Sequence, residues 1–130
     1  SSDLVLRLAG LYWPGRMQLV ERVRIGAQCV PREVPLCANR SHVDDAASAI
    51  THLLRLPVPL PLYLGVDGTP LPLHELCDFL AQLIGASPPG EGAAPVGVGS
   101  KRLRNARLRA SGWAPAWPDA RDGYAALLDT

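Results

Sequence analysis

The sequence predicts an α/β fold that contains part of a parallel sheet. Short apolar runs with the character of buried strands alternate along the chain with amphipathic helical patterns, as they do where parallel strands are joined by helices. The 130 residues suffice for one domain, and 48% of them are apolar, which excludes disorder throughout. Only two runs read as inner strands, and two strands leave peptide groups unpaired at the sheet edges. We therefore expect further strands to come from outside this chain.

The first element is a strand over residues 4–10, an apolar run with a single charge that is typical of a strand buried on both faces. From Met17 to Arg24 apolar residues recur at near-helical spacing, and Gly26 follows, which predicts a short helix. Residues 27–43 show no clear period, and we expect short strands and turns there.

A longer helix begins at Asp44 and Asp45, and its apolar side chains share one face before Pro57 ends it. Carboxylates at a helix start interact favourably with the helix dipole, by about 0.3–1 kcal/mol each. We interpret both aspartates as helix-start residues and not as catalysts.

A second buried strand over residues 60–66 leads into a turn at Asp67-Gly68. Pro72 suits the first position of the next helix, which has the most regular apolar pattern in the chain. Gly85 is a suitable residue to end that helix.

Residues 86–99 are mostly Gly, Ala, Pro and Ser, and predict a mobile loop or linker. A short helix over residues 105–110 follows, and Asp119 is placed to cap a last helix. Five basic residues that could contact phosphate or RNA lie just before and within this short helix: Lys101, Arg102, Arg104, Arg107 and Arg109. The net charge of +1 and the lack of interleaved aromatic residues favour a solvated face and no nucleic-acid partner.

The three cysteines, Cys29, Cys37 and Cys77, are odd in number and widely spaced, which predicts reduced thiols in a cytoplasmic protein. Cys37, His42, His74 and Cys77 could suggest a zinc site, but their spacings fit no standard one, so we expect no metal. No apolar run approaches the roughly 20 residues that cross a bilayer, so we expect no membrane partner.

Four segments resemble, in order, parts of the extended and atypical short-chain dehydrogenase/reductases, the group that contains the NAD-dependent epimerases and dehydratases. Residues 6–16 (LRLAGLYWPGR) resemble the motif of the sixth strand, and residues 39–47 (NRSHVDDAA) resemble the segment N-R-I-H-V-D-D-L-A. Residues 63–70 (YLGVDGTP) resemble the last sheet strand, and residues 101–124 resemble the closing segment. The ordered set covers nearly the whole chain.

This resemblance implies the carboxy-terminal portion of an NAD(P)-binding Rossmann-like fold: its last parallel strands and a small substrate-binding subdomain. Residues 1–130 would form a single carboxy-terminal segment. Within it, residues 1–16 and 58–85 would belong to the Rossmann-like core, and residues 17–57 and 86–130 to the substrate-binding subdomain.

The chemistry of the family is absent from this chain. It has no glycine-rich dinucleotide turn after a strand, and no Tyr-x-x-x-Lys pair, because the residues four places after its tyrosines are Arg16, Asp67 and Leu128. Arginine stays protonated and does not replace the lysine. We expect no catalytic residue here, NAD or NADP only in the complete protein and none on this chain alone. The start at Ser1-Ser2-Asp3 suggests a preceding Rossmann segment or a companion chain, without which we expect the chain to be unstable.

The resemblance also implies a site at the end of the first strand. Backbone near Leu8, Ala9 and Gly10 would pass the nicotinamide, and Gly10 stands where the family often has Asn. A small-molecule substrate would face three further residues, Tyr12, Trp13 and Arg16. The alternative is a structural turn with a packed tryptophan.

Arg40 and His42 precede a helix start, and the planar fork of Arg40 could hold a substrate anion. Ala38 stands where nucleotide-sugar enzymes of the family often place a phosphate-contacting arginine, which disfavours a nucleotide sugar. The alternative is a strand-edge arginine and a buried histidine. Ser41 and His42 lie too close in sequence to Asp44 to form a hydrolytic triad on a strand.

Three functions stay open. The chain could be the substrate-binding part of an NAD(P)-dependent oxidoreductase or epimerase, or part of a non-catalytic dinucleotide-binding sensor or scaffold. It could also be a free-standing interaction domain whose strand edges and Trp13 meet a partner, and a homo-oligomer is open in each case.

Overall fold

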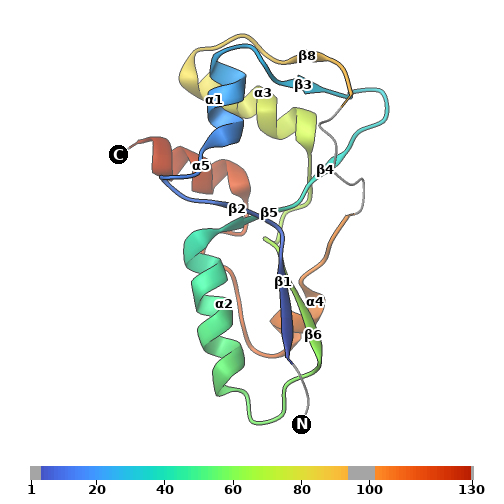
Figure 1. The fold of residues 1–130 in the computed structure, drawn as a ribbon, viewed down its shortest axis with the longest axis vertical. Helices are drawn as coiled ribbons and strands as arrows, with labels where there is room; N and C mark the ends of the chain where they lie inside the picture. The colour runs from blue at the N-terminus through green and yellow to red at the C-terminus, as the bar shows by residue number, and fades with distance from the viewer. Residues whose placement is uncertain (1–3, 94–101, 130) are drawn as a thin grey trace.

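The computed structural model describes residues 4–93 and 102–129. Figure 1 shows an elongated molecule with two regions joined where β2 and β5 meet. At one end, the strand pair β1 and β6 lies beside α2, and α4 overlaps the pair in this view; at the other end α1, α3 and α5 gather beneath the short strands β3 and β8. The predicted α/β class with parallel strands is confirmed.

The two predicted inner strands pair with each other. β1 (Val5–Leu8) runs parallel to β6 (Leu62–Gly65), in register from Val5 opposite Leu62 to Leu8 opposite Gly65. Burial of β1 on both faces was wrongly predicted, because its residues alternate between exposed and half-exposed and Val5 is 42% exposed.

The apolar run over residues 4–10 is not one strand. Ala9 makes the last bond to β6, and the chain then enters β2 (Gly10–Tyr12), which pairs in parallel with β5 (Arg40–His42). The continuous run conceals this change of partner, because apolar character carries no information about which strand is paired.

The outer edge of β6 is covered by the segment that carries α4 (Ala106–Ala110). The guanidinium of Arg107 donates to the Leu62 carbonyl at 3.5 Å, and the Asn105 amide donates to the Val66 carbonyl at 2.9 Å. Side chains thus occupy outward carbonyls that a further strand would need, so β6 lies at the end of its sheet.

The outer edge of β1 is different. The Val5 amide donates to the Pro61 carbonyl at 2.8 Å and the Ala9 amide to the Gly65 carbonyl at 3.0 Å, so alternate peptides of β1 face β6. The amides of Leu6 and Leu8 therefore point away from β6, and residues 4–93 and 102–129 supply no strand beside them. A further strand could join the sheet only on this side.

The helices lie where the sequence predicts them. They are α1 (Gln18–Arg24), α2 (Val43–Arg55), α3 (Leu73–Ile84), α4 and α5 (Ala120–Leu128). Gly85 ends α3 in the left-handed conformation, with φ of 71°, and the Asp119 carboxylate caps α5 by accepting from the Arg121 amide at 2.9 Å.

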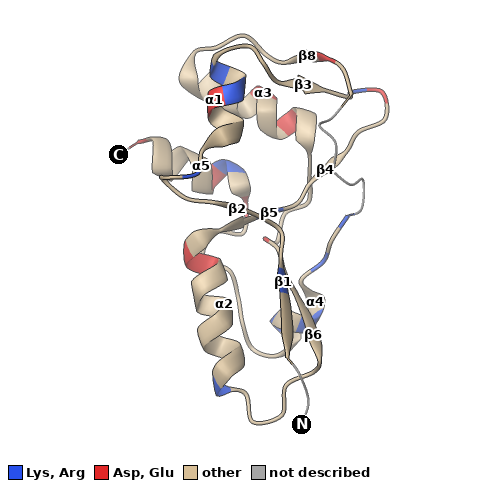
Figure 2. Cartoon of the chain, in the orientation of Figure 1, with Lys and Arg blue, Asp and Glu red and all other residues tan. Residues whose placement is uncertain are grey.

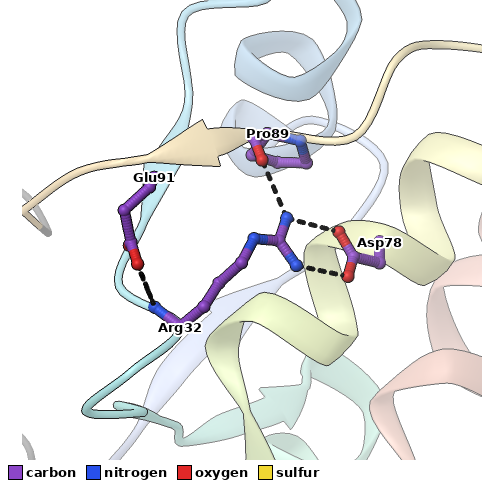
Figure 3. Close-up of polar contacts among 4 residues, drawn as sticks. All are labelled: Arg32, Asp78, Pro89 and Glu91. Carbon is purple, nitrogen blue, oxygen red and sulfur yellow. Dashed lines mark hydrogen bonds and ion pairs between the residues drawn. The ribbon is translucent and has the colours of Figure 1, made fainter.

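The predicted loop over residues 86–99 is partly ordered by pairing, which its composition does not signal. β8 (Gly90–Glu91) runs parallel to β3 (Cys29–Val30). Figure 3 shows how Arg32 fastens this pair: its guanidinium binds both oxygens of Asp78 at 2.7 and 2.8 Å and the Pro89 carbonyl at 2.7 Å. The rest of that predicted loop, from residue 94, lies outside the described residues.

The short strands expected within residues 27–43 are completed by β4 (Cys37–Ala38), which pairs antiparallel with β7 (Leu71–Pro72). All three cysteines are unpaired, as predicted. In the part of the chain that the structure describes, no helix has the length and apolar character to cross a membrane, and no three His, Cys, Asp or Glu side chains are grouped to hold a metal ion.

Two groups of buried side chains make the core. The larger lies among α1, α3 and α5, and the smaller joins α2, β6 and α4 through Leu53, Tyr63, Leu108 and Trp113. α3 packs in the larger group, against α1 and α5. The sequence-based division instead assigned residues 58–85, which include α3, to the Rossmann-like core together with the two strands. Which group binds substrate stays a prediction.

Candidate functional site

The predicted cofactor-contacting residues lie at the carboxyl end of β1. Leu8 pairs with Gly65, the Ala9 amide donates to the Gly65 carbonyl, and Gly10 opens β2 opposite Arg40. Open α/β sheets bind ligands in crevices at the carboxyl ends of their strands. The crossing from the β1–β6 pair to the β2–β5 pair is therefore where we look for a site (Figure 1).

A cavity of about 130 Å³ lies at this crossing, and it brings together Gly10, Arg16 and Arg40, which the sequence predicted as site residues. Its other lining residues were not predicted: Leu11, Gln18, Leu19, Arg22 and Tyr124. Gln18 and Arg22 are four residues apart on α1, a spacing that places them on one helix face. That spacing was the available signal, but it indicates a site only because the fold brings this face of α1 and the start of β2 to the same cavity.

Gly10 gives the Arg40 side chain its space. A Cβ atom at position 10 would lie 3.0 Å from Nη1 of Arg40 and 3.1 Å from the Asn39 carbonyl oxygen. The asparagine that the family often has at this position would therefore compete with the guanidinium. Nε of Arg40 is buried and has no hydrogen-bond partner in residues 4–93 and 102–129.

Arg16 is held at the mouth of the cavity by a tight turn. Its amide donates to the Trp13 carbonyl at 2.8 Å, and its guanidinium lies 5.4 Å from the centre of the Trp13 ring. Such cation–π contacts orient an exposed arginine. Trp13 itself does not line the cavity but contacts Arg16, which does, and its contact with substrate stays a prediction.

Tyr12 and His42 are interior residues and do not line the cavity. The Tyr12 ring stacks on Tyr124, with centroids 4.2 Å apart, and meets His42 edge-on at 5.3 Å. His42 stacks on Trp117 at 5.2 Å and caps α2, because its Nδ1 accepts from the Asp44 amide at 3.0 Å. The alternative of a buried histidine describes His42 better than substrate contact does.

Asp45 does more than begin a helix, which corrects its interpretation as a simple helix-start residue. It is 3% exposed, and its two oxygens accept from the amides of Ala116 at 2.7 Å and Trp117 at 2.9 Å. Asp44, by contrast, is exposed. Asp45 thus anchors the loop that sets Trp117 against His42.

Asp67 is a buried carboxyl at the junction of the two regions. Its amide donates to the Arg40 carbonyl at 2.8 Å, Oδ1 accepts from the Thr69 amide at 3.3 Å, and Oδ2 is buried without a described partner. Burial raises the pKa of Asp67 to about 7, and the nearby carboxylates of Asp119 and Asp45 add to this effect. The sequence indicated only a turn here.

The basic residues at Arg102, Arg104, Arg107 and Arg109 are exposed, as the solvated-face interpretation expects, while Lys101 lies outside the described residues. Figure 2 shows that the basic residues of α1 and those near α4 lie at opposite ends of the molecule. The cavity arginines, of which Arg22 lies on α1, are therefore separate from the basic residues near α4.

Comparison with solved structures gives close matches over nearly the whole chain, whereas no protein-family model and no curated protein matches it. A Methylobacillus flagellatus protein provisionally described as an NAD-dependent epimerase/dehydratase is 38% identical, with a TM-score of 0.79, over 97% of this chain and 46% of its own. A functionally unknown conserved protein from Silicibacter pomeroyi is 27% identical, with a TM-score of 0.80, over 96% of this chain and 48% of its own.

A human epimerase family protein with NADPH shares the fold, with a TM-score of 0.79 at 14% identity, over 100% of this chain and 49% of its own. The chain thus spans about half the length of the structures that it matches, and the matched half is their carboxy-terminal part.

Proposed function

We propose that this chain, which has the carboxy-terminal fold of the NAD-dependent epimerase/dehydratase proteins, forms the substrate-binding side of an NAD(P)-dependent oxidoreductase or epimerase and is not catalytic alone. The observation that carries the proposal is the contrast between the two sheet edges. The edge of β6 is covered by α4, and the edge of β1 presents unpaired amides of Leu6 and Leu8.

The partner in this proposal is a Rossmann segment, on the same or another polypeptide, whose last strand pairs with β1. That strand would form hydrogen bonds with the outward peptide groups of β1, which otherwise bind water. It would also cover the half-exposed apolar side chains of β1. A second copy of this chain, paired through the same edge, is the homo-oligomeric alternative. The unpaired cysteines favour a reducing compartment, the cytoplasm.

The residues present fit only the border of a dinucleotide site. Gly10 lines the cavity and Leu8 and Ala9 directly precede it, so the end of β1 offers backbone and the small residues Ala9 and Gly10 to a flat nicotinamide ring. The pyrophosphate requires a glycine turn that opens a helix after a strand, and the sequence has none. When bound, NAD(P) would supply hydride transfer, while Arg16 and Arg40 would hold and orient the substrate.

Fragment assembly tests the proposal. The chain is mixed with the separately produced amino-terminal part of the Methylobacillus flagellatus protein, and co-elution and NADH fluorescence are measured. We expect the chain alone to bind no dinucleotide and to co-elute with that partner. Replacing Leu6 by Pro removes an outward amide and should abolish co-elution, whereas Arg107→Gln, at the opposite edge, should leave it intact. Micromolar dinucleotide affinity of the chain alone would overturn the proposed division of labour.

A further inference from the structure

We infer that the cavity lined by Arg16, Arg22 and Arg40 binds the phosphate of a small phosphate-monoester substrate. The inference names a substrate class for the site proposed above and so rests on that proposed function. It draws on three observations: the charge of the lining, an unpartnered buried donor, and the size of the space.

The charge of the cavity is unbalanced. Three arginines line it and no Asp or Glu does. Arg24 and Arg32 elsewhere in the chain have carboxylate partners, but Arg16, Arg22 and Arg40 form no ion pair within the described residues. Guanidinium groups stay protonated, so the lining carries an excess of positive charge that attracts an anion from outside, although the Asp67 carboxyl also interacts with Arg40.

Arg40 supplies the sharpest signal of a missing acceptor. Buried N–H groups nearly always have a hydrogen-bond partner, and the buried Nε of Arg40 has none in the described structure. The strand pairing of β5 with β2 fixes the backbone of Arg40, so this donor is held in place before a ligand arrives. A phosphate oxygen fits the planar fork of an arginine better than water does.

The size of the cavity limits what can enter it. Its volume of about 130 Å³ is well below the roughly 300–1,000 Å³ of pockets that enclose whole drug-sized ligands, so the cavity suits a small group such as one phosphate. The rest of the substrate would therefore lie outside the cavity. Gly10, which lines the cavity, is also one of the residues predicted to contact the nicotinamide.

The lining residues have separable tasks. Arg40 would bind from the strand side, and Arg22 with Gln18 from α1. Arg16 would close the mouth, braced by Trp13. Because each contact combines a charge with hydrogen bonds, loss of one guanidinium should weaken phosphate binding about 10- to 100-fold.

The test uses this chain with inorganic phosphate and methyl phosphate as probes, and acetate and chloride at equal ionic strength as controls. The guanidinium Nε–H signals of the arginines are followed by NMR, and the folded fraction is followed by circular dichroism. The variants are Arg40→Gln, Arg22→Gln and Arg40→Lys, which keeps the charge and loses the fork. Arg24→Gln is the matched control, because it removes the same charge from the same helix outside the cavity.

We expect saturable binding of both phosphates that raises the folded fraction, shifts the signals of Arg16, Arg22 and Arg40, and weakens in the three cavity variants but not in Arg24→Gln. An unchanged folded fraction and unshifted arginine signals up to about 10 mM phosphate would overturn the inference. Equal weakening in Arg24→Gln would do so too, as would acetate binding as tightly as phosphate. Fragment assembly would be unaffected by these failures, so the proposed function stands or falls separately.

Discussion

The Asp67→Asn substitution should make stability less dependent on pH. The Asp67 carboxyl is 7% exposed, and its pKa of about 7 in the folded chain lies above the ordinary value of 3.8. Between those two values the folded chain holds a proton that the unfolded chain has lost. The free energy of unfolding therefore falls as pH rises through this range, and the contribution is fully present only below the unfolded pKa.

The magnitude follows from the size of the shift. Three pKa units correspond to about 4 kcal/mol at 1.36 kcal/mol per unit, and incomplete titration at the acid end reduces the measurable part to about 3–4 kcal/mol. Asparagine cannot ionise, and its oxygen still accepts from the Thr69 amide. Its buried NH₂ adds a penalty of about 1–3 kcal/mol, but that penalty does not change with pH.

Urea unfolding of both proteins, each assembled with the amino-terminal partner and monitored by tryptophan fluorescence at about pH 4, 6 and 8, measures the difference. The midpoint of Asp67→Asn relative to the parent should rise by about 1–3 M urea between the lowest and the highest pH. A difference between the two midpoints that stays constant with pH would refute a buried, protonated Asp67.

Three further predictions concern packing. Asp45→Ala removes the acceptor of two part-buried backbone amides before α5 and should lower the free energy of unfolding by about 1–3 kcal/mol, whereas Asp44→Ala should cost about 0.5 kcal/mol or less. Equal losses in urea titrations would argue against the anchor. Gly123→Ala places a methyl group inside the contact distance of the Tyr12 hydroxyl and should lower the free energy of unfolding by about 1–3 kcal/mol. Adding Tyr12→Phe should restore part of that loss, and additive effects of the two substitutions would contradict the contact. Arg32→Gln should speed proteolysis near β8, and unchanged cleavage would show that the ion pair does not hold this segment.

The helices could be predicted because their signals are local. Periodic apolar side chains, a capping Asp119 and a terminating Gly85 each act within a few residues, and the structure confirms them. The parallel orientation of the two apolar strands was also predicted, from the alternation of strand and helix along the sequence, but not that they pair with each other.

Features that depend on distant contacts could not be predicted. The pairing of β3 with β8 depends on Arg32, which reaches Asp78 across 46 residues. Burial turns Asp45 into an anchor and raises the pKa of Asp67, and neither effect has a sequence signal. Within the site, Arg16 and Arg40 were indicated from the sequence, but Arg22 joins them only because the fold brings α1 to the same cavity.

Amide hydrogen exchange along β1 tests the central claim most directly. In the isolated chain, the amides of Leu6 and Leu8 should exchange far faster than those of Val5 and Ala9, which donate to β6. On addition of the amino-terminal partner, Leu6 and Leu8 should become protected, because their amides then donate to a new strand. Equal protection of all four amides in a monomeric isolated chain would mean that the edge of β1 is already filled and that no companion strand is needed.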